Sequence, residues 1–460
     1  MSQPVQASKE NKPATQKMTN YRWFVAILIF VLYTIANADR ANIGVALPFI
    51  KKEFGLSNTE AGGIVSILFM AYAIMQIPGG FIYTKVGVKK VLPISMFLTS
   101  FFTLMQGLTS SVLTFKLARF CLGLSEGPMP TGCLTTVNNW FPSKEKGTAG
   151  GIYAAASKCG PVITPTIGVL VMRYYGNWRG IFIVCAIPGV ILSIIWYLMV
   201  ADKPSESRFV SAAESDYIAT ETATAINVVG KVKPRREMKW LDRLIRAKKI
   251  EPIDTNKKLF CSWNIIGNAL GYACINGLIY ALISWIPTYL VTVKGFVSIK
   301  MGFLAAAPFV GALVGNVFGG WFSDSVLNKR RKPTMIIGGL CTTITMYALI
   351  SAPNNPLLLA LFLFLAGVSF SFGFAAFQIY PMGVTTKKMY PVSYGFTNVF
   401  AQIGSSVFPF VVGYLLDHYG WNAVFLFLAS CAIASVLFIS SIDEPITENV
   451  VAPKVAQSAS

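Results

Sequence analysis

Twelve apolar stretches, each long enough to cross a lipid bilayer, divide this chain of 460 residues. A helix needs about 20 apolar residues to cross a hydrocarbon core of about 30 Å. Because backbone polar groups find no water in lipid, such stretches must be helices that pack against one another. The predicted spans are 23–48, 61–83, 91–110, 112–139, 147–172, 180–200, 259–292, 300–322, 333–352, 356–381, 391–416 and 421–441. With 54% hydrophobic and only 13% charged residues, the predicted fold class is an all-α membrane protein with twelve transmembrane helices.

The spans fall into two groups of six, and this grouping sets the predicted domain boundaries. We expect a cytoplasmic tail at 1–22, a six-helix bundle at 23–200 and a cytoplasmic linker at 201–258. A second six-helix bundle at 259–441 and a cytoplasmic tail at 442–460 follow.

The linker is predicted to contain an amphipathic helix. Four of its apolar residues share one side of this helix, namely Trp240, Leu241, Leu244 and Ile245. The opposite side is charged, which is typical of a helix that lies on the surface of a membrane. We expect this helix to position the two halves on the inner leaflet, and a lipid-sensing or partner-binding role is the alternative.

Basic residues are distributed asymmetrically around the spans. Thirteen lie in 201–258 alone. The segments on the opposite side of the membrane hold only Lys51, Lys52, Arg173, Arg179, Lys294 and Lys300. The positive-inside rule then predicts a multi-pass protein of the cell inner membrane, with both termini cytoplasmic. Because the net charge of +19 follows from this topology, it does not indicate a nucleic-acid partner, and the lipid bilayer is the expected surrounding.

Two acidic residues, Asp39 and Glu126, lie within the predicted spans. An ionisable group at membrane depth costs roughly 2.5 to 3.5 kcal/mol, so it tends to mark the path of an ion or a substrate. Arg40 follows Asp39, Arg119 precedes Glu126 by seven residues on the same helix face, and Lys158 falls near the middle of the fifth span. The second half has only amides, hydroxyls and aromatic groups at such depths.

These five groups carry a formal charge of +1, which becomes +3 when both acids are protonated. A site that becomes more positive on protonation attracts an anion, because a desolvated carboxylate needs a cation or several donors. The pattern therefore predicts coupled uptake of protons and a small organic anion. The alternative is a bracing role, in which Asp39 pairs with Arg40 or Arg119 and Glu126 pairs with Lys158.

Metal and nucleotide sites are not predicted. The eight cysteines lie almost wholly within apolar stretches and show no CxxC spacing, so they favour neither a metal site nor a disulfide framework. No glycine-rich loop ends in GK[ST], the sequence that binds nucleotide phosphates. We expect no cofactor, no catalytic residue and no enzymatic activity.

The two halves repeat one another in sequence. A loop at 79–90 begins with two glycines and ends in a basic cluster, and a similar loop at 319–332 lies 240 residues later. The segment at 175–178, Tyr-Gly-Asn-Trp, recurs as Tyr-Gly-Trp at 419–421, with an offset of 244. Two concordant offsets indicate a duplication.

The repeated loop resembles the signature loop of the major facilitator superfamily, and the resemblance covers nearly the whole chain. It implies two pseudo-symmetric six-helix bundles, with a substrate that is held near the midplane and exposed alternately to either side. The chain departs from the signature at Thr84, where this loop usually has an aspartate, so a gating ion pair is expected only in the second half. The implied gating residues are Gly80, Lys85, Gly87, Lys89 and Asp324.

Two further motifs, Asn-x-Asp-Arg-x-Asn-Ile at 37–43 and Arg-x-x-x-Gly-x-x-Glu-Gly at 119–127, resemble the anion:cation symporter family. That family includes bacterial galactonate, glucarate and hexuronate symporters, phthalate-type permeases, sialin and vesicular glutamate carriers. The resemblance implies that Asp39 and Glu126 bind protons. In the fifth span the sugar-acid members have a glutamine and then an aromatic residue, where this chain has Ser-Lys. The predicted substrate-binding residues are Arg40, Arg119, Tyr72, Ser157, Lys158, Asn398 and Gln402.

Taken together, these features predict a monomeric secondary transporter that imports a small organic anion with protons by alternating access. A sugar acid such as a hexonate or hexuronate is expected, because amides and tyrosines are available to bind hydroxyls. The alternatives are a symporter of a dicarboxylate or aromatic acid, a drug or cation antiporter, and a sensor that binds the anion without moving it. Lys158 is expected either to brace Glu126 or to bind a second carboxylate or a carbonyl of the substrate.

Overall fold

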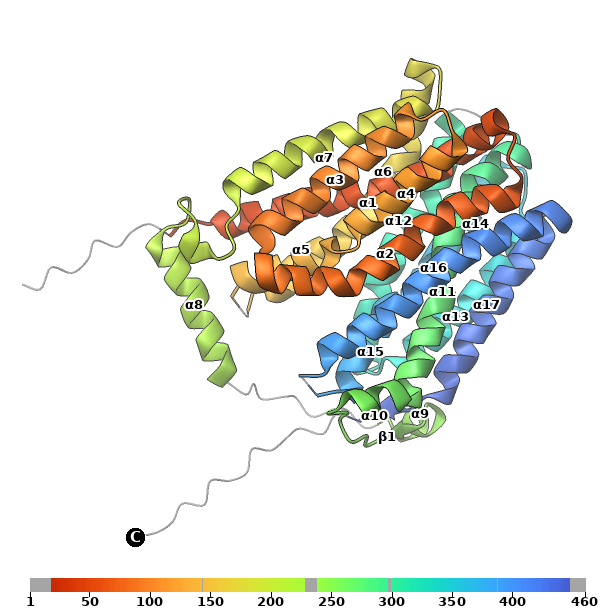
Figure 1. The fold of residues 1–460 in the computed structure, drawn as a ribbon. Coiled ribbons are helices and arrows are strands. Elements are labelled where there is room, and N and C mark those ends of the chain that lie inside the picture. The colour runs from red at the N-terminus through yellow and green to blue at the C-terminus, as the bar shows by residue number, and fades with distance from the viewer. Residues whose placement is uncertain (1–17, 143, 228–237, 297–298, 387, 447–460) are drawn as a thin grey trace, which may run out of the picture.

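The computed structural model describes residues 18–142, 144–227, 238–296, 299–386 and 388–446. Its long helices form two bundles that lie side by side (Figure 1). The first bundle contains α1 (Tyr21–Phe54), α2 (Asn58–Val86), α3 (Val88–Leu108), α4 (Val112–Glu126), α5 (Met129–Trp140), α6 (Lys146–Tyr175) and α7 (Arg179–Met199). The second contains α11 (Trp263–Thr292), α12 (Ile299–Trp321), α13 (Lys332–Ala348), α14 (Pro356–Phe372), α15 (Phe374–Val384), α16 (Tyr390–His418) and α17 (Trp421–Ser441).

Shorter elements complete the chain. The linker holds a 3₁₀ turn (Pro204–Glu206), α8 (Ala212–Asn227), α9 (Lys239–Leu244), β1 (Ala247–Lys248) and α10 (Asn256–Cys261). A π-helical turn (Phe322–Val326) follows α12, and a 3₁₀ turn (Leu349–Ser351) follows α13. The strand β2 (Glu444–Pro445) pairs in parallel with β1, with Ala247 opposite Glu444.

The predicted all-α architecture is confirmed, and eleven of the predicted spans are long apolar helical segments within the described residues. The remaining span, 112–139, consists of α4 and α5, which are interrupted at Gly127 and Pro128. The corresponding span of the second half, 356–381, is interrupted at Gly373 between α14 and α15. The two halves therefore share an interrupted fourth span. Interrupted membrane helices at matching positions of a repeat commonly flank a substrate site.

Glycines allow the helices within each half to approach closely. A Cβ atom on Gly123 of α4 would overlap the carbonyl oxygen of Leu68 on α2. In the second half, Gly311, Gly315 and Gly319 of α12 each face a backbone carbonyl of α14 in the same manner. Small residues at such positions favour van der Waals packing between membrane helices.

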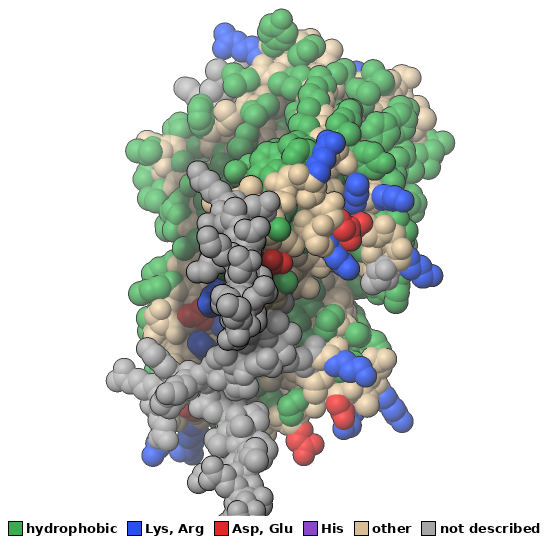
Figure 2. All heavy atoms as spheres, turned by 90° about the vertical axis from the view of Figure 1, so that its left-hand side faces the viewer, with side chains coloured by type: hydrophobic (Ala, Val, Ile, Leu, Met, Phe, Trp, Pro, Cys, Tyr) green, Lys and Arg blue, Asp and Glu red, His purple; other side chains and the backbone are tan. Residues whose placement is uncertain are grey.

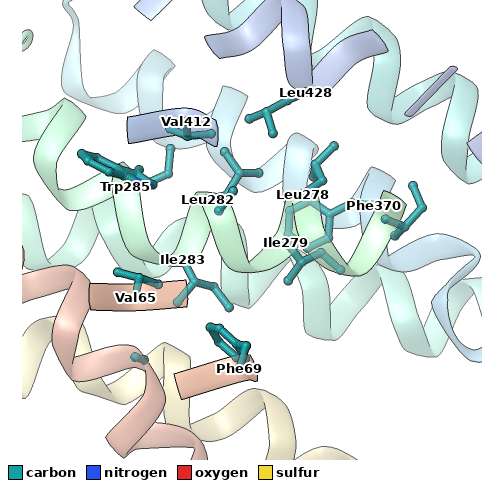
Figure 3. Close-up of a cluster of buried hydrophobic side chains, with 14 of the residues drawn as sticks. Val65, Phe69, Leu278, Ile279, Leu282, Ile283, Trp285, Phe370, Val412 and Leu428 are labelled. Atoms are coloured by element: carbon teal, nitrogen blue, oxygen red, sulfur yellow. The ribbon is translucent and has the colours of Figure 1, made fainter. Parts of the chain in front are cut away.

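The seam between the two bundles is closed on one side of the molecule. We call the side that carries the linker the linker side and the opposite side the far side. On the far side, the Asp417 carboxylate of α16 accepts hydrogen bonds from the Asn58 and Thr59 amides of α2, at 2.9 and 2.8 Å. Nearer the middle, Val65 and Phe69 of α2 face Ile279 and Ile283 of α11 (Figure 3).

The linker is attached to each bundle separately. In the first bundle, the buried Glu214 of α8 accepts hydrogen bonds from the Arg22 amide and side chain at the start of α1. In the second bundle, Asp242 of α9 pairs with Arg330 at 2.6 Å, and the buried Lys332 ammonium donates to the Ile245 carbonyl. Figure 2 faces the side on which α8 lies and shows Lys and Arg side chains scattered across it. Among these contacts of the described residues, α8 binds only the first bundle and the segment around α9 binds only the second.

The predicted amphipathic helix of the linker is the six-residue helix α9 and the residue after it. Its four apolar residues divide into two pairs: Leu241 and Ile245 are buried with Leu327, whereas Trp240 and Leu244 are 77% and 66% exposed. One pair thus anchors the linker to the second bundle, and the exposed pair is free to meet another surface. The placement of α9 on the inner leaflet of the membrane stays a prediction.

The closed seam leads to a prediction about two adjacent glycines of α2. A Cβ atom on Gly62 would overlap the Pro409 carbonyl oxygen of α16, whereas a Cβ atom on Gly63 would lie 3.9 Å from the Phe410 ring. We expect Gly62→Ala to cost about 1 to 3 kcal/mol of stability in this conformation through overpacking. Gly63→Ala is the matched control, since both changes raise helix propensity equally. Thermal unfolding in detergent measures both, and equal midpoints for the two variants would contradict the described seam.

Candidate functional site

The charged residues predicted from the sequence meet in the middle of the first bundle. Asp39 and Glu126 are completely buried, and Arg40 and Arg119 are 5% and 1% exposed. The Arg40 Nε donates to Glu126 Oε2 at 2.5 Å, which ties α1 to the end of α4. The Arg40 guanidinium carbon also lies 4.5 Å from the centroid of the Tyr72 ring of α2, so this cation has an ionic and an aromatic partner.

Asp39 and Arg119 complete the group, but they form no ion pair with each other of the kind that joins Arg40 to Glu126. Within the described residues neither Asp39 oxygen has a partner in hydrogen-bond geometry, although Glu126, Arg119, Arg40 and the Thr103 side chain are its electrostatic neighbours. The Nε and Nη2 atoms of Arg119 are also without partners there. Buried polar atoms of this kind are costly unless a partner satisfies them. Two carboxylates and two guanidinium groups therefore lie together in the first bundle, and several of their polar atoms lack a hydrogen-bond partner among the described residues.

A row of polar side chains on α3 was not predicted as part of the site. Thr99, Thr103 and Gln106 are completely buried. Their spacing of four and three residues places them on one face of the helix, toward the charged group. Polar residues at this spacing within an apolar span are the signal that could have identified the row. Asn42, also completely buried, has no side-chain partner among the described residues.

Lys158 of α6 does not pair with Glu126, which was one of the two predicted arrangements. Its ammonium nitrogen lies 4.2 Å from the centroid of the Phe374 ring, at the start of α15 in the second bundle. Glu126 is paired with Arg40 instead. The adjacent Ser157 hydroxyl donates to the Ala154 carbonyl of its own helix at 2.7 Å.

The second bundle supplies uncharged groups around Phe374. Its ring packs against Tyr272, at 5.4 Å between centroids, and the Tyr272 hydroxyl accepts a hydrogen bond of 2.8 Å from Gln378. On α16, the predicted residues Asn398 and Gln402 are half-buried and buried respectively. The Gln402 Oε1 has no partner among the described residues, so it is free to accept a hydrogen bond from a hydroxyl.

The predicted gating loops differ between the halves. In the second, Asp324 pairs with Arg331 at 2.8 Å, the ion pair expected there. In the first, Gly87 has φ of 88°, and the Asp202 carboxylate lies beside it and accepts from the Lys89 amide at 2.9 Å. Gly80 faces open space and Lys85 is exposed.

An acidic residue after the last span of each half caps the third span of that half. Asp202 does so at the start of α3, and Glu444 accepts from the Arg331 and Lys332 amides at the start of α13. Carboxylates at helix N-termini satisfy unpaired amides and the helix dipole. Within the described residues, no group of three or more His, Cys, Asp and Glu side chains is arranged to hold a metal ion.

Comparisons with known proteins agree with this architecture. The chain is 31% identical over 435 residues to the probable galactarate/D-glucarate transporter GudP of Bacillus subtilis (strain 168), which covers 92% of this chain and 91% of the relative. It is 28% identical over 445 residues to the D-galactonate transporter of Escherichia coli O6:H1, covering 95% and 97%. A solved structure of a D-xylose-proton symporter superposes with a TM-score of 0.70 at 15% identity, covering 92% of this chain and 98% of that one.

A solved bacterial homologue of the human lysosomal transporter Spinster, in an inward-facing and occupied conformation, also has a TM-score of 0.70. Its identity to this chain is 16%, with 92% and 95% of the two chains covered. Both structures therefore support the fold. The family model of the Major Facilitator Superfamily matches residues 29–409 and 298–456. The repeated loops, the two six-span bundles and this match show that the chain belongs to the Major Facilitator Superfamily.

Proposed function

We propose that this protein imports a sugar acid together with protons. The observation that carries the proposal is the buried ion pair between Arg40 and Glu126. An ion pair at membrane depth adds little stability over apolar packing, so its presence is better explained by a functional role. The names of the relatives, which are transporters of galactarate, D-glucarate and D-galactonate, support a sugar acid as the substrate class.

In the proposed cycle, a proton on Glu126 releases Arg40 to the substrate. Arg40 is buried, and breaking a buried ion pair by neutralising one partner leaves the other charge uncompensated, at a cost of about 3 to 5 kcal/mol. A substrate carboxylate that accepts from the guanidinium removes this cost. Proton binding and anion binding therefore favour each other, which is the thermodynamic requirement for symport.

Asp39 and Arg119 could act in the same way, with a proton on the carboxylate freeing the arginine to bind the substrate. The Asp39 carboxylate lies among the charges of Glu126 and Arg119. A proton on Asp39 would leave Arg119 as an uncompensated cation with free donors, able to bind a carboxylate through two parallel hydrogen bonds.

Alternating access requires the seam to open on the far side. If the linker side is cytoplasmic, as the distribution of basic residues indicates, the described conformation is closed to the outside. The far-side seam consists of close helix contacts and the Asp417 cap on α2. These contacts would break and reform once in each cycle, which favours weak packing interactions over ion pairs at this position.

A drug or cation antiporter fits the site less well. Such a protein would require a net acidic site, whereas the two acids here are matched by two arginines and Lys158 adds a positive charge. A sensor that binds the same anion without moving it would share the binding residues. Accumulation of substrate in proteoliposomes distinguishes a transporter from a sensor.

The first functional prediction concerns Glu126. We expect Glu126→Gln to abolish accumulation of galactarate or D-galactonate driven by a pH gradient, because the amide mimics a permanently protonated acid. Exchange of internal for external substrate, which needs no net proton movement, should persist. Radiolabelled uptake and counterflow in proteoliposomes measure the two activities.

The matched control is Glu53→Gln, which changes an acid at the far end of α1 that pairs with Arg179. This variant should accumulate substrate as the wild type does. Gradient-driven accumulation by Glu126→Gln at the wild-type level would exclude Glu126 as a coupling group.

The second functional prediction concerns Arg119. Its Nε and Nη2 donors have no hydrogen-bond partner among the described residues, and a lysine cannot reproduce their planar geometry. We expect Arg119→Lys to weaken substrate binding by at least about 1.4 kcal/mol, or roughly tenfold. Arg179→Lys at the protein surface should have no such effect. Isothermal titration of purified protein gives both affinities, and a wild-type affinity in Arg119→Lys would leave Arg40 as the carboxylate-binding cation.

A further inference from the structure

Lys158 is a cation in the seam, and no acidic residue in the described part of the chain forms an ion pair with it. Its ammonium nitrogen lies 4.2 Å from the centroid of the Phe374 ring, across the seam from α6 to α15. Within the described residues no carboxylate forms an ion pair with it, and it is half-buried. A cation over an aromatic ring gains about 0.5 to 2 kcal/mol, which is small beside the cost of placing an ammonium group at membrane depth. The contact with Phe374 therefore does not account for a lysine at this position.

The position of Lys158 relative to Arg40 follows from the packing of α6 on α1. A Cβ atom on Gly160 would lie 2.6 Å from both the Thr34 carbonyl oxygen and the Ala38 amide nitrogen, so these parts of the helices are level. The two helices run in the same direction. Lys158 lies just before this level on α6, and Arg40 lies just after it on α1. At 1.5 Å of rise per residue, the two Cα atoms are roughly 8 Å apart along the helix axes.

The charges of the site favour a substrate with two negative groups. Arg40 is matched by Glu126, and Arg119 has Asp39 and Glu126 as electrostatic neighbours. These four groups sum to zero when all are ionised, which leaves Lys158 as the excess charge. One proton on either acid raises the total to +2, the charge that a dicarboxylate would neutralise.

We propose that Lys158 binds a second carboxylate of the substrate, so that the protein transports dicarboxylic sugar acids in preference to monocarboxylic ones. This inference rests on the proposed function and names the substrate class of the same site. One carboxylate binds an arginine of the first bundle, and the other binds the Lys158 ammonium about one and a half helical turns closer to the linker side.

Binding at Lys158 also changes a contact of the seam. The ammonium group must leave the Phe374 ring, or share it, to form an ion pair with a carboxylate. Because the lysine and the ring belong to different bundles, a dicarboxylate replaces a contact between the bundles by a contact within one of them. Substrate binding at Lys158 thus removes a contact that holds the two bundles together in this conformation.

The test compares galactarate with D-galactonate, two sugar acids that differ in whether the chain ends in one carboxylate or two. Their affinities for the purified full-length protein are measured by isothermal titration for the wild type and three variants. We expect Lys158→Gln to weaken galactarate binding at least about tenfold, as loss of a charge-assisted hydrogen bond should, and D-galactonate binding less than about threefold. Lys158→Arg, which keeps the charge, should retain most of the preference for galactarate.

Phe374→Leu distinguishes substrate binding from bracing. This variant removes the aromatic ring and keeps the ammonium group, so the preference for galactarate should persist or increase. If Phe374→Leu and Lys158→Gln weaken both ligands equally, Lys158 is a brace between the bundles and the inference is overturned.

The remaining outcomes separate the inference from the proposed function. A wild type that binds D-galactonate but not galactarate would overturn the inference and leave a sugar-acid transporter. A wild type that binds neither compound would overturn the proposed function and the inference together. Thermal unfolding of each variant shows whether a loss of binding reflects a loss of fold.

Discussion

The Arg40–Glu126 ion pair is the interaction on which the rest of the site depends. It joins α1 to the interrupted end of α4 in the middle of the first bundle, where both side chains are almost completely buried. A buried charge needs a partner, and neutralising one member of the pair leaves the other charge uncompensated. Burial makes the pair costly as a structural element. It also makes the pair suitable for coupling, because one proton on Glu126 would free Arg40 to bind a substrate carboxylate.

The second bundle contributes no charge to this group and instead supplies a wall of aromatic and amide side chains. Phe374, Tyr272 and Gln378 form one connected set, and Lys158 reaches it from the first bundle. The far-side seam is made from close contacts such as Gly62 against Pro409 and from the hydrogen bonds of Asp417. Among the described residues, no ion pair of the site crosses the seam between the bundles. A site that is charged in one bundle and uncharged in the other can therefore keep an anion bound while the two bundles move relative to each other.

The long apolar runs predicted the fold because membrane depth admits few backbone arrangements, and the sequence repeat predicted the two halves. The cluster of Asp39, Arg40, Arg119 and Glu126 was also predictable, because helical rise places these residues at similar depths. Their pairing was not predictable, because depth arithmetic could not say which way each side chain turns. Glu126, whose predicted partner in a bracing role was Lys158, pairs with Arg40 instead. The role of Asp202 at Gly87 and the division of the linker helix, with Leu241 buried and Trp240 exposed, depend on tertiary contacts that local periodicity does not encode.

The most direct test of the account is the number of protons that the purified protein takes up when it binds substrate. Titration calorimetry with galactarate at one pH, in buffers of different ionisation enthalpy, gives this number from the dependence of the binding heat on the buffer. We expect uptake of about one proton or more per substrate in the wild type and a smaller number in Glu126→Gln, because binding and protonation are linked. Substrate binding without proton uptake in the wild type, or the same uptake in both proteins, would contradict it.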